Sequence, residues 1–389
     1  MAKAMQAVLL LLLFIQLAMG QTDVPEAPRI ESVAMSARQP QAADAATIWY
    51  DDFDGPPKAY AESSGNLDDK CAFGGAGKSM LCLYEKGKQG RGNRKVFFGD
   101  APAYRNKAVR VGEKFEDVYW RIYVKHQKGW TGGGPAKLSR ATSIVSETWA
   151  QAMIAHVWSS GEALTLDPAS GVVGGQVVTT KYNDFDKLHW LGNKPVSKFK
   201  FSSAEESGWW VVVEARAKLN TPGRADGEFQ LWIDGRLESE RKKLNWRGSY
   251  AAHGINAVFL EAYWNAGSPV TQSRWYDNFV ISTKPIGPVT APRNPVLLKT
   301  PFVGPGAQAA WEVELAADPD GAAVVWRSSG LGDETRVRVE PAHGAFAGPL
   351  AGKTALAPGA TYWCRARQQG STFPWSPWSG WHQAFVTEQ

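Results

Sequence analysis

The stretch DVYWRIYVKH, residues 117–126, has the most regular alternation in this sequence. Apolar residues at 118, 120, 122 and 124 alternate with polar or tyrosine residues at 119, 121, 123 and 125. Because successive side chains of a β-strand point to opposite faces of a sheet, this alternation predicts a half-buried strand. Its apolar face would pack on a second layer, and the other face would present Tyr119, Arg121, Tyr123 and Lys125.

Further strand-like runs follow on both sides of this stretch, separated by Gly, Asp and Asn turns. The clearest cover residues 152–158, 172–180, 209–219, 228–233, 256–264 and 275–282. The dipeptide Asp234-Gly235 lies between two such runs and is a signal for a two-residue hairpin turn. Helical periodicity is nearly absent, so we expect an all-β fold with a large antiparallel jelly-roll sandwich over residues 46–286.

The chain begins with a short basic and apolar segment. Residues 1–20 contain one lysine, an apolar core over 7–17 and a small-residue end, which is typical of a signal peptide. An uncleaved anchor is the alternative, but the apolar core is shorter than the roughly 20 residues of a membrane span. We therefore expect a secreted protein without a membrane span after cleavage. Residues 21–45, rich in Ala, Pro, Gln and Ser without periodicity, are expected to be a disordered leader.

Composition argues against several classes of function. The 389 residues include 43 Lys+Arg and 38 Asp+Glu, and no basic cluster is dense enough to indicate nucleic-acid binding. The sequence has no P-loop, no GxGxxG before a helix, no HExxH and no Gly-x-Ser-x-Gly, so nucleotide, zincin and esterase chemistry are not indicated. The net charge of +5 and the 18 tryptophans suit an anionic partner with exposed aromatic contacts.

The three cysteines predict one disulfide bond. Cys71 and Cys82 lie close together around a Gly-rich loop, and in a secreted chain this arrangement favours a bond between them. Cys364 follows Tyr362-Trp363 in a strand-like run, so we expect it to be a buried, unpaired thiol.

The last part of the chain predicts a second, smaller domain. Residues 287–293 form a Pro-rich linker, and residues 294–389 are the right length for a small immunoglobulin-like sandwich. LAPGATYWCRAR (356–367) and WSPWS (375–379) together resemble fibronectin type III domains. The resemblance implies a tyrosine corner at Tyr362 and tryptophans interleaved with Arg365 and Arg367, and it implies no particular function.

Four segments of the large domain carry a second resemblance. They are IWYDDFD (48–54), VYWRIYVKHQKGWTGGGPAKL (118–138), GEFQLWIDGRL (227–237) and RWYDNFVIS (274–282). Residues 47–284 resemble the concanavalin-A-like jelly roll of secreted polysaccharide lyases and carbohydrate-binding proteins. The nearest pattern is that of the alginate and glucuronan lyases of families 14 and 20. The resemblance implies a concave sheet face that holds a polysaccharide chain.

The residue types on the predicted strands suit a uronic acid substrate. Arg121 could neutralise the carboxylate, Tyr123 or His156 could take the C5 proton, and Tyr263 or Lys137 could assist the leaving oxygen. Lys137-Leu138 matches a functional Gly-Lys-Leu element of family 14. The next functional positions of that family fall on residues without matching chemistry: Met153, Ala155, Leu164 and Leu166. An ordinary solvated sheet face remains the alternative interpretation.

Further side chains are expected to bind the sugar chain or a metal ion. Aromatic rings can stack on sugars, and polar side chains on the same faces can bind hydroxyl or carboxylate groups. The candidates are Lys125, Trp158, Gln230, Trp232, Glu261 and Trp264. Asp52 and Asp277, on neighbouring first and last strands, are expected to hold a structural Ca²⁺, with turn and capping roles as the alternative.

Three functions therefore remain open. The first is a secreted enzyme that cleaves an acidic polysaccharide by β-elimination at a uronic acid. The second is a non-catalytic carbohydrate-binding or adhesion protein. The third is a matrix or surface protein that uses both domains for protein contacts. The identity of the polysaccharide does not follow from the sequence.

Overall fold

The computed structural model describes residues 24–372 and 374–389. The predicted signal peptide and the start of the leader lie outside these residues. The described part consists of β-strands and three short 3₁₀ helices, η1 (Pro40–Ala42), η2 (Phe73–Gly75) and η3 (Gly348–Leu350). The predicted all-β class is confirmed. In this part of the chain no helix has the length and apolar character needed to cross a membrane.

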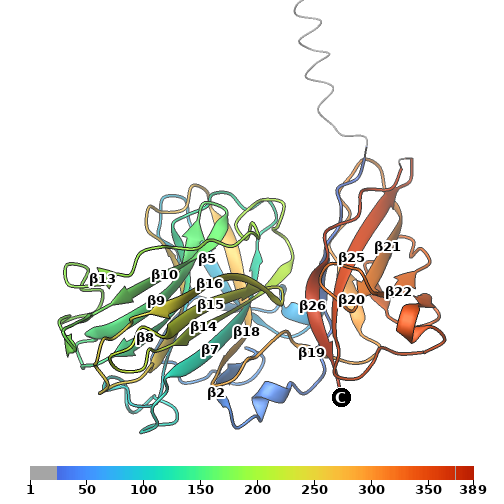
Figure 1. Cartoon of the computed structure of the whole chain (residues 1–389). Helices are drawn as coiled ribbons and strands as arrows, with labels where there is room; N and C mark the ends of the chain where they lie inside the picture. The colour runs from blue at the N-terminus through green and yellow to red at the C-terminus, as the bar shows by residue number, and fades with distance from the viewer. Residues whose placement is uncertain (1–23, 373) are drawn as a thin grey trace, which may run out of the picture.

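The large domain contains two main sheets (Figure 1). The back sheet has the order β16 (Arg236–Leu244), β15 (Gly227–Ile233), β14 (Trp210–Lys218), β7 (Asp117–His126), β18 (Gln272–Ser282), β5 (Ser79–Tyr84), β4 (Asn66–Asp68), with β2 (Thr47–Asp51) also paired to β18. The front sheet has the order β13 (His189–Trp190), β10 (Ala163–Ser170), β9 (Gln151–Ser160), β8 (Ala136–Ile144), β17 (Ala257–Trp264), β6 (Asn93–Phe97), β3 (Glu62–Ser64). A short ribbon, β11 (Val172–Val173) with β12 (Gln176–Val177), lies outside both sheets.

The core of this domain lies between the two sheets. The apolar residues of strand β7 point into this core, and Trp120 packs against Phe229 of β15 with ring centroids 6.3 Å apart. Asp234 and Gly235 both have positive φ, 50° and 75°, and they turn the chain between β15 and β16. This is the backbone that a tight two-residue hairpin requires, so the predicted turn is confirmed.

The C-terminal part forms a second sandwich. One sheet has the order β19 (Thr290–Ala291), β26 (His382–Thr387), β25 (Thr361–Gly370), β21 (Gln308–Ala316), β22 (Val324–Ser328), β24 (Gly344–Phe346). The other has β1 (Ile30–Val33), β20 (Val296–Lys299) and β23 (Arg336–Arg338). The expected disordered leader is therefore wrong for the described residues from 24 onward, because β1 pairs with β20 and Ile30 and Val33 are fully buried.

Two predicted features of the C-terminal sandwich are present. The Tyr362 hydroxyl accepts a hydrogen bond from the Ala357 amide at 3.1 Å, as in a tyrosine corner. The guanidinium of Arg365 lies 4.8 Å from the ring centroids of both Trp378 and Trp381, and that of Arg367 lies 4.7 Å from Trp375 and Trp378. The relation to fibronectin type III domains itself stays a prediction.

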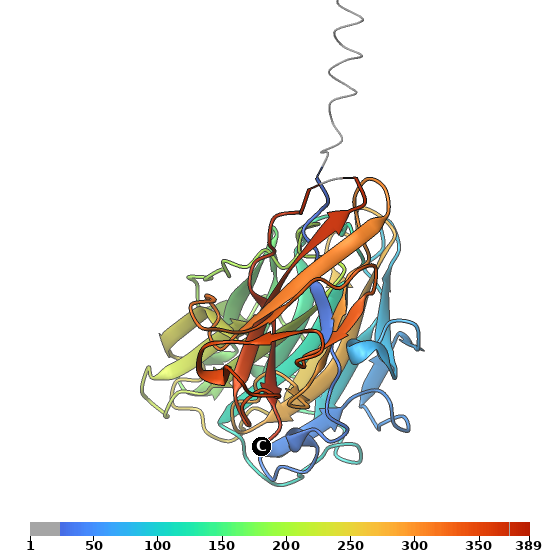
Figure 2. The same ribbon diagram turned by 90° about the vertical axis from the view of Figure 1, so that its right-hand side faces the viewer.

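The C-terminal sandwich packs against the outer face of the back sheet, and Figure 2 views the molecule from that side. Gln383 of β26 connects the C-terminal sandwich to the back sheet. Its side-chain amide donates to the carbonyls of Ile30, Glu31 and Trp210 at 3.2, 2.8 and 3.0 Å. The Trp363 indole donates to the carbonyl of Asp234 at 3.0 Å. The outer face of the back sheet is therefore largely an interdomain surface.

This packing overturns the expected position of the groove. Arg121 is fully buried and donates to the Gly287 carbonyl at 3.0 Å. The Tyr123 hydroxyl, also buried, accepts from the Val289 amide at 2.9 Å, and Lys125 pairs with Glu31. These three side chains hold the linker and β1, so the prediction that they line a ligand groove is wrong.

The predicted disulfide is also wrong, because the two cysteines lie on different sides of the back sheet. Cys82 points into the core between the sheets, whereas Cys71 packs against the apolar cluster shared with the C-terminal sandwich. All three cysteines are free thiols. Burial raises the pKa of Cys71 to about 11 and that of Cys82 to about 12, which keeps both in the unreactive thiol form.

Candidate functional site

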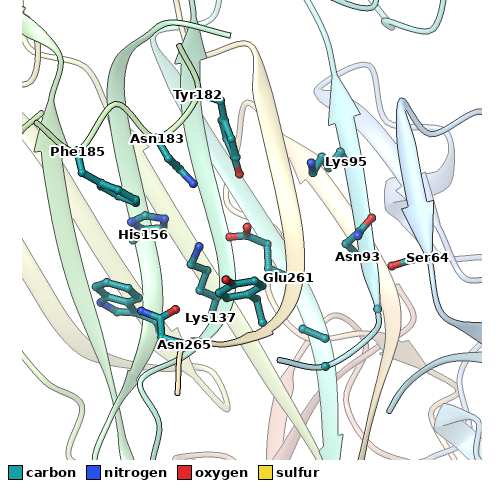
Figure 3. A pocket seen from close by; sticks show the side chains of 15 residues that line it. Ser64, Asn93, Lys95, Lys137, His156, Tyr182, Asn183, Phe185, Glu261 and Asn265 are labelled. Carbon is teal, nitrogen blue, oxygen red and sulfur yellow. The ribbon is translucent and has the colours of Figure 1, made fainter. Parts of the chain in front are cut away.

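An open pocket of about 510 Å³ lies on the outer face of the front sheet (Figure 3). The C-terminal sandwich packs on the other sheet, so this face is uncovered. Five strands and three loops supply the walls of the pocket. It is lined by Ser64, Gly90, Gly92, Asn93, Lys95, Lys137, His156, Trp158, Tyr182, Asn183, Phe185, Glu261, Ala262, Tyr263 and Asn265.

Strand register brings the polar residues together. His156 of β9 lies directly opposite Arg140 of β8 and Asp167 of β10, so the three side chains share one face. The register shifts between Lys137 and Ser139, and Leu138 and Ser139 consequently both point into the core. This β-bulge leaves Lys137 and Arg140 on the same outer face although they are three residues apart.

A buried ion pair forms the floor of the pocket. Arg140 is fully buried, and its guanidinium donates to both carboxylate oxygens of Glu261 at 2.8 and 2.6 Å. Its remaining nitrogen donates to the side-chain oxygen of Asn183 at 2.9 Å. Arg140 therefore connects β8 to β17 and fixes the loop that carries Tyr182, Asn183 and Phe185.

Lys137 and Tyr263 lie next to each other in the pocket. The Lys137 ammonium lies 4.6 Å from the centroid of the Tyr263 ring, and this tyrosine is 37% exposed. Burial lowers the pKa of Lys137; Glu261 opposes this effect, while Arg140 and Lys95 add to it. A lysine with a lowered pKa supplies more neutral amine near neutral pH, and a neutral amine can accept a proton.

His156 has a different character. Burial holds its pKa well below the usual range, and the charges of Arg140, Lys137 and Lys194 lower it further. Neither ring nitrogen has a hydrogen-bond partner among the described residues. The neutral ring stacks on Trp158 with a centroid distance of 5.1 Å. It can hydrogen-bond a ligand, but its low pKa makes it a weak base.

Tyr182 and Lys95 close the pocket on the side of β6, and Figure 3 shows both pointing into it. The Lys95 ammonium lies 5.5 Å from the Tyr182 ring centroid and pairs with Glu62 of β3. Burial raises the pKa of Tyr182 well above its usual value, so the phenol is neutral and can donate a hydrogen bond.

The structure brings five of the predicted residues into this pocket: Lys137, His156, Trp158, Glu261 and Tyr263. Whether they act in catalysis or binding stays a prediction. Sequence reasoning missed Lys95, Arg140, Tyr182, Asn183 and Phe185. The alternation in NRKVF (93–97) could have indicated Lys95, whereas the three loop residues follow no strand pattern.

The four positions that the family resemblance selected do not lie in the pocket. Met153, Ala155, Leu164 and Leu166, which the resemblance selected, all point into the core. Their neighbours on the opposite face are His156 on β9 and Thr165 and Asp167 on β10. Because successive side chains of a strand point to opposite faces, the four selected residues line no part of the outer face.

The other predicted substrate-binding residues lie elsewhere. Trp264 is buried in the core, where it packs against Trp130 with a centroid distance of 5.9 Å. Gln230 and Trp232 lie on β15, on the outer face of the back sheet; Gln230 accepts a hydrogen bond from Arg216, and Trp232 packs near Tyr119. Together with Lys125 they are separated from the pocket by the thickness of the sandwich.

The expected calcium ligands do not fit an oxygen-coordinated cation. One carboxylate oxygen of Asp277 accepts from the Phe73 amide at 2.8 Å, and the other accepts from the Asn278 amide at 2.7 Å. Asp52 accepts from the Tyr50 hydroxyl at 3.2 Å and the Asp54 amide at 3.3 Å. In the described part of the chain no three Asp, Glu, His or Cys side chains converge on a metal position. The alternative turn role accounts for these contacts.

No protein family and no curated protein matches the chain. Among solved structures, it is similar to an endo-β-1,4-glucuronan lyase from the fungus Trichoderma reesei, with 14% identity, a TM-score of 0.42, and coverage of 61% of this chain and 96% of that one. A marine PL-14 alginate lyase from Aplysia kurodai gives 14% identity, a TM-score of 0.41, and coverage of 62% and 100%. The cellulose-induced protein Cip1 has 15% identity and a TM-score of 0.33, and the match covers 61% of this chain and 99% of that one. Identities and TM-scores in this range establish no activity for the chain.

Proposed function

We propose that the front-sheet pocket binds an acidic polysaccharide and cleaves it by β-elimination beside a uronic acid residue. The observation that carries this proposal is the contact between Lys137, whose pKa is lowered, and the partly exposed Tyr263. The reaction needs two adjacent groups, one that accepts a proton from the substrate and one that donates a proton to it.

In the reaction a base removes the proton from C5 of the uronate. The electron pair left on C5 forms a double bond to C4, the bond from C4 to the bridging oxygen breaks, and that oxygen takes a proton. We assign the proton abstraction to the neutral amine of Lys137 and the proton donation to the hydroxyl of Tyr263. No external oxidant, reductant or metal is required for this balance.

The remaining side chains hold the substrate. Lys95 and the side-chain amide of Asn183 would bind the uronate carboxylate, because Asn183 uses its oxygen to accept from Arg140 and keeps its NH₂ group for a ligand. The unpartnered nitrogens of His156 would hydrogen-bond a sugar hydroxyl. Arg140 is a positioning residue, because its three guanidinium nitrogens already donate hydrogen bonds to Glu261 and Asn183.

The test is an incubation with alginate, glucuronan and glycosaminoglycans, followed by the ultraviolet absorbance of the unsaturated product. Lys137→Ala should lower the rate by about a hundredfold or more, the usual contribution of a general base. Lys242→Ala, which removes an exposed lysine on the back sheet, is the control and should leave the rate unchanged. A parent protein that forms no product from any uronate polymer, or a Lys137→Ala variant at full rate, would refute the proposal.

A non-catalytic carbohydrate-binding protein is the second candidate. It is favoured by the low pKa of His156, because the pocket then lacks a histidine base of ordinary strength. Retained binding to uronate polymers without any product would select this function.

A further inference from the structure

A group of aromatic rings continues the pocket beyond Trp158 toward the edge of the front sheet. Phe185 and Trp190 are unusually exposed for their size, at 55% and 37%. The Trp190 ring lies 6.2 Å from that of Trp158 with an angle of 13° between the planes, and 6.4 Å from that of Phe185 with an angle of 16°. Exposed aromatic rings with nearly parallel planes, next to a pocket, indicate a surface for a flat ligand.

The backbone holds this aromatic group in place. Trp190 of β13 pairs with Ala169 of β10, so its position is fixed by the sheet. The loop carrying Phe185 is held at Asn183, whose amide donates to the Gln151 side chain at 2.8 Å. Preorganised rings lose little conformational entropy when a ligand binds, which is what a built binding surface requires.

A positive charge lies over the same rings. The Lys194 ammonium is 5.3 Å from the Trp190 centroid and 5.8 Å from that of Trp158. It is anchored by the buried carboxylate of Asp167 at 2.9 Å, while its own side chain is 48% exposed. Because an ammonium has three N–H donors, it can bind Asp167 and still donate to a ligand.

We propose that Trp158, Phe185, Trp190 and Lys194 form a distal subsite for a second acidic sugar ring of the same polysaccharide chain. This inference rests on the proposed function of the pocket. The apolar face of the sugar would stack on the indole rings, and its carboxylate would meet Lys194. The strand order places β13 two strands beyond β9, about 10 Å further across the sheet, so the ring bound there is not the one that reacts at Lys137.

Charge and position favour an acidic oligosaccharide over an apolar partner. Lys194 and Lys95 lie at opposite ends of this face of the front sheet, on the loop after β13 and on β6. A repeating carboxylate along a sugar chain matches cations spaced in this way, whereas an apolar partner would desolvate them and offer them no hydrogen-bond acceptor.

The experiment is calorimetric titration of the full chain carrying Lys137→Ala, which prevents turnover, with a glucuronan disaccharide and a glucuronan hexasaccharide. Adding Trp190→Ala should weaken hexasaccharide binding about five- to tenfold and leave the disaccharide unaffected, because only the longer chain reaches the subsite. Lys194→Gln should weaken hexasaccharide binding more at low than at high salt, since salt screens an exposed charge contact. Phe302→Ala, a partly exposed aromatic residue of the C-terminal sandwich, is the control and should change neither affinity.

The outcomes separate this inference from the proposed function. Equal losses for both oligosaccharides, or no loss for either, in a Trp190→Ala variant with the parent melting temperature would overturn the subsite alone. Trp190→Phe should recover most of the hexasaccharide affinity if stacking is the cause, and failure to recover would count against stacking. A protein that binds neither oligosaccharide would overturn the subsite, and it would overturn the proposed function as well if the parent forms no product from alginate, glucuronan or glycosaminoglycans.

Discussion

Replacing Glu261 by glutamine should destabilise the protein by about 3 kcal/mol. The substitution keeps the shape of the side chain but removes the charge that faces the fully buried Arg140. Breaking a buried ion pair by removing one partner costs about 3–5 kcal/mol, because the other charge stays desolvated without compensation. We expect the lower end of this range, since the glutamine oxygen and Asn183 can still accept hydrogen bonds from the guanidinium.

The stability difference between the parent and the Glu261→Gln variant should depend on pH in a definite direction. Burial raises the pKa of Glu261, but Arg140, Lys137 and Lys95 lower it by more, and the folded-state pKa lies below the ordinary value. A depressed carboxyl pKa stabilises the fold above the unfolded value of about 4.3, and the stabilisation is lost as pH falls through the folded value. The difference between parent and variant should therefore be constant around neutral pH and shrink below about pH 4.

The measurement is urea unfolding followed by tryptophan fluorescence, with Glu62→Gln as the matched control. Glu62 also pairs with a cation of the front sheet, Lys95, but its side chain is 40% exposed. Exposed pairs contribute about 0–1 kcal/mol, so this control should change stability little. Equal effects of the two substitutions, or a loss under 1 kcal/mol for Glu261→Gln, would show that the Arg140 pair is solvated and does not form a buried floor of the pocket.

Two further predictions concern the interdomain surface and the C-terminal sandwich. Arg121→Met should lower the free energy of unfolding by about 2 kcal/mol, because the buried carbonyls of Gly287 and Asn278 lose their hydrogen-bond donor. The same substitution should leave uronate binding unchanged. Weaker binding by a fully folded variant would contradict the position of the site. Tyr362→Phe should cost about 1 kcal/mol through loss of the bond from the Ala357 amide, measured by urea unfolding, and an unchanged stability would mean that this corner does not lock the sandwich.

Alternation along the strands predicted the layers of the fold and failed to choose between its two outer faces. On β7 it correctly separated the core-facing Trp120 from the outward-facing Arg121. It could not reveal that a second sandwich covers that outward face, because a covered polar face and a solvated one have the same period. The bulge after Lys137 was equally hidden, since an extra residue leaves no signature in a single sequence.

The order of the strands explains which face is free. β2 and β18, the first and last long strands of the jelly roll, pair with each other in the back sheet. The chain before β2 contains β1, and the chain after β18 contains the linker and β20, so both segments leave the jelly roll from the same sheet. Because β1 and β20 pair with each other, the second sandwich must assemble beside that sheet, where Arg121 and Tyr123 bind the linker. The front sheet is then the outer face of the jelly roll that the second sandwich leaves uncovered, and the pocket that contains Lys137 lies on it.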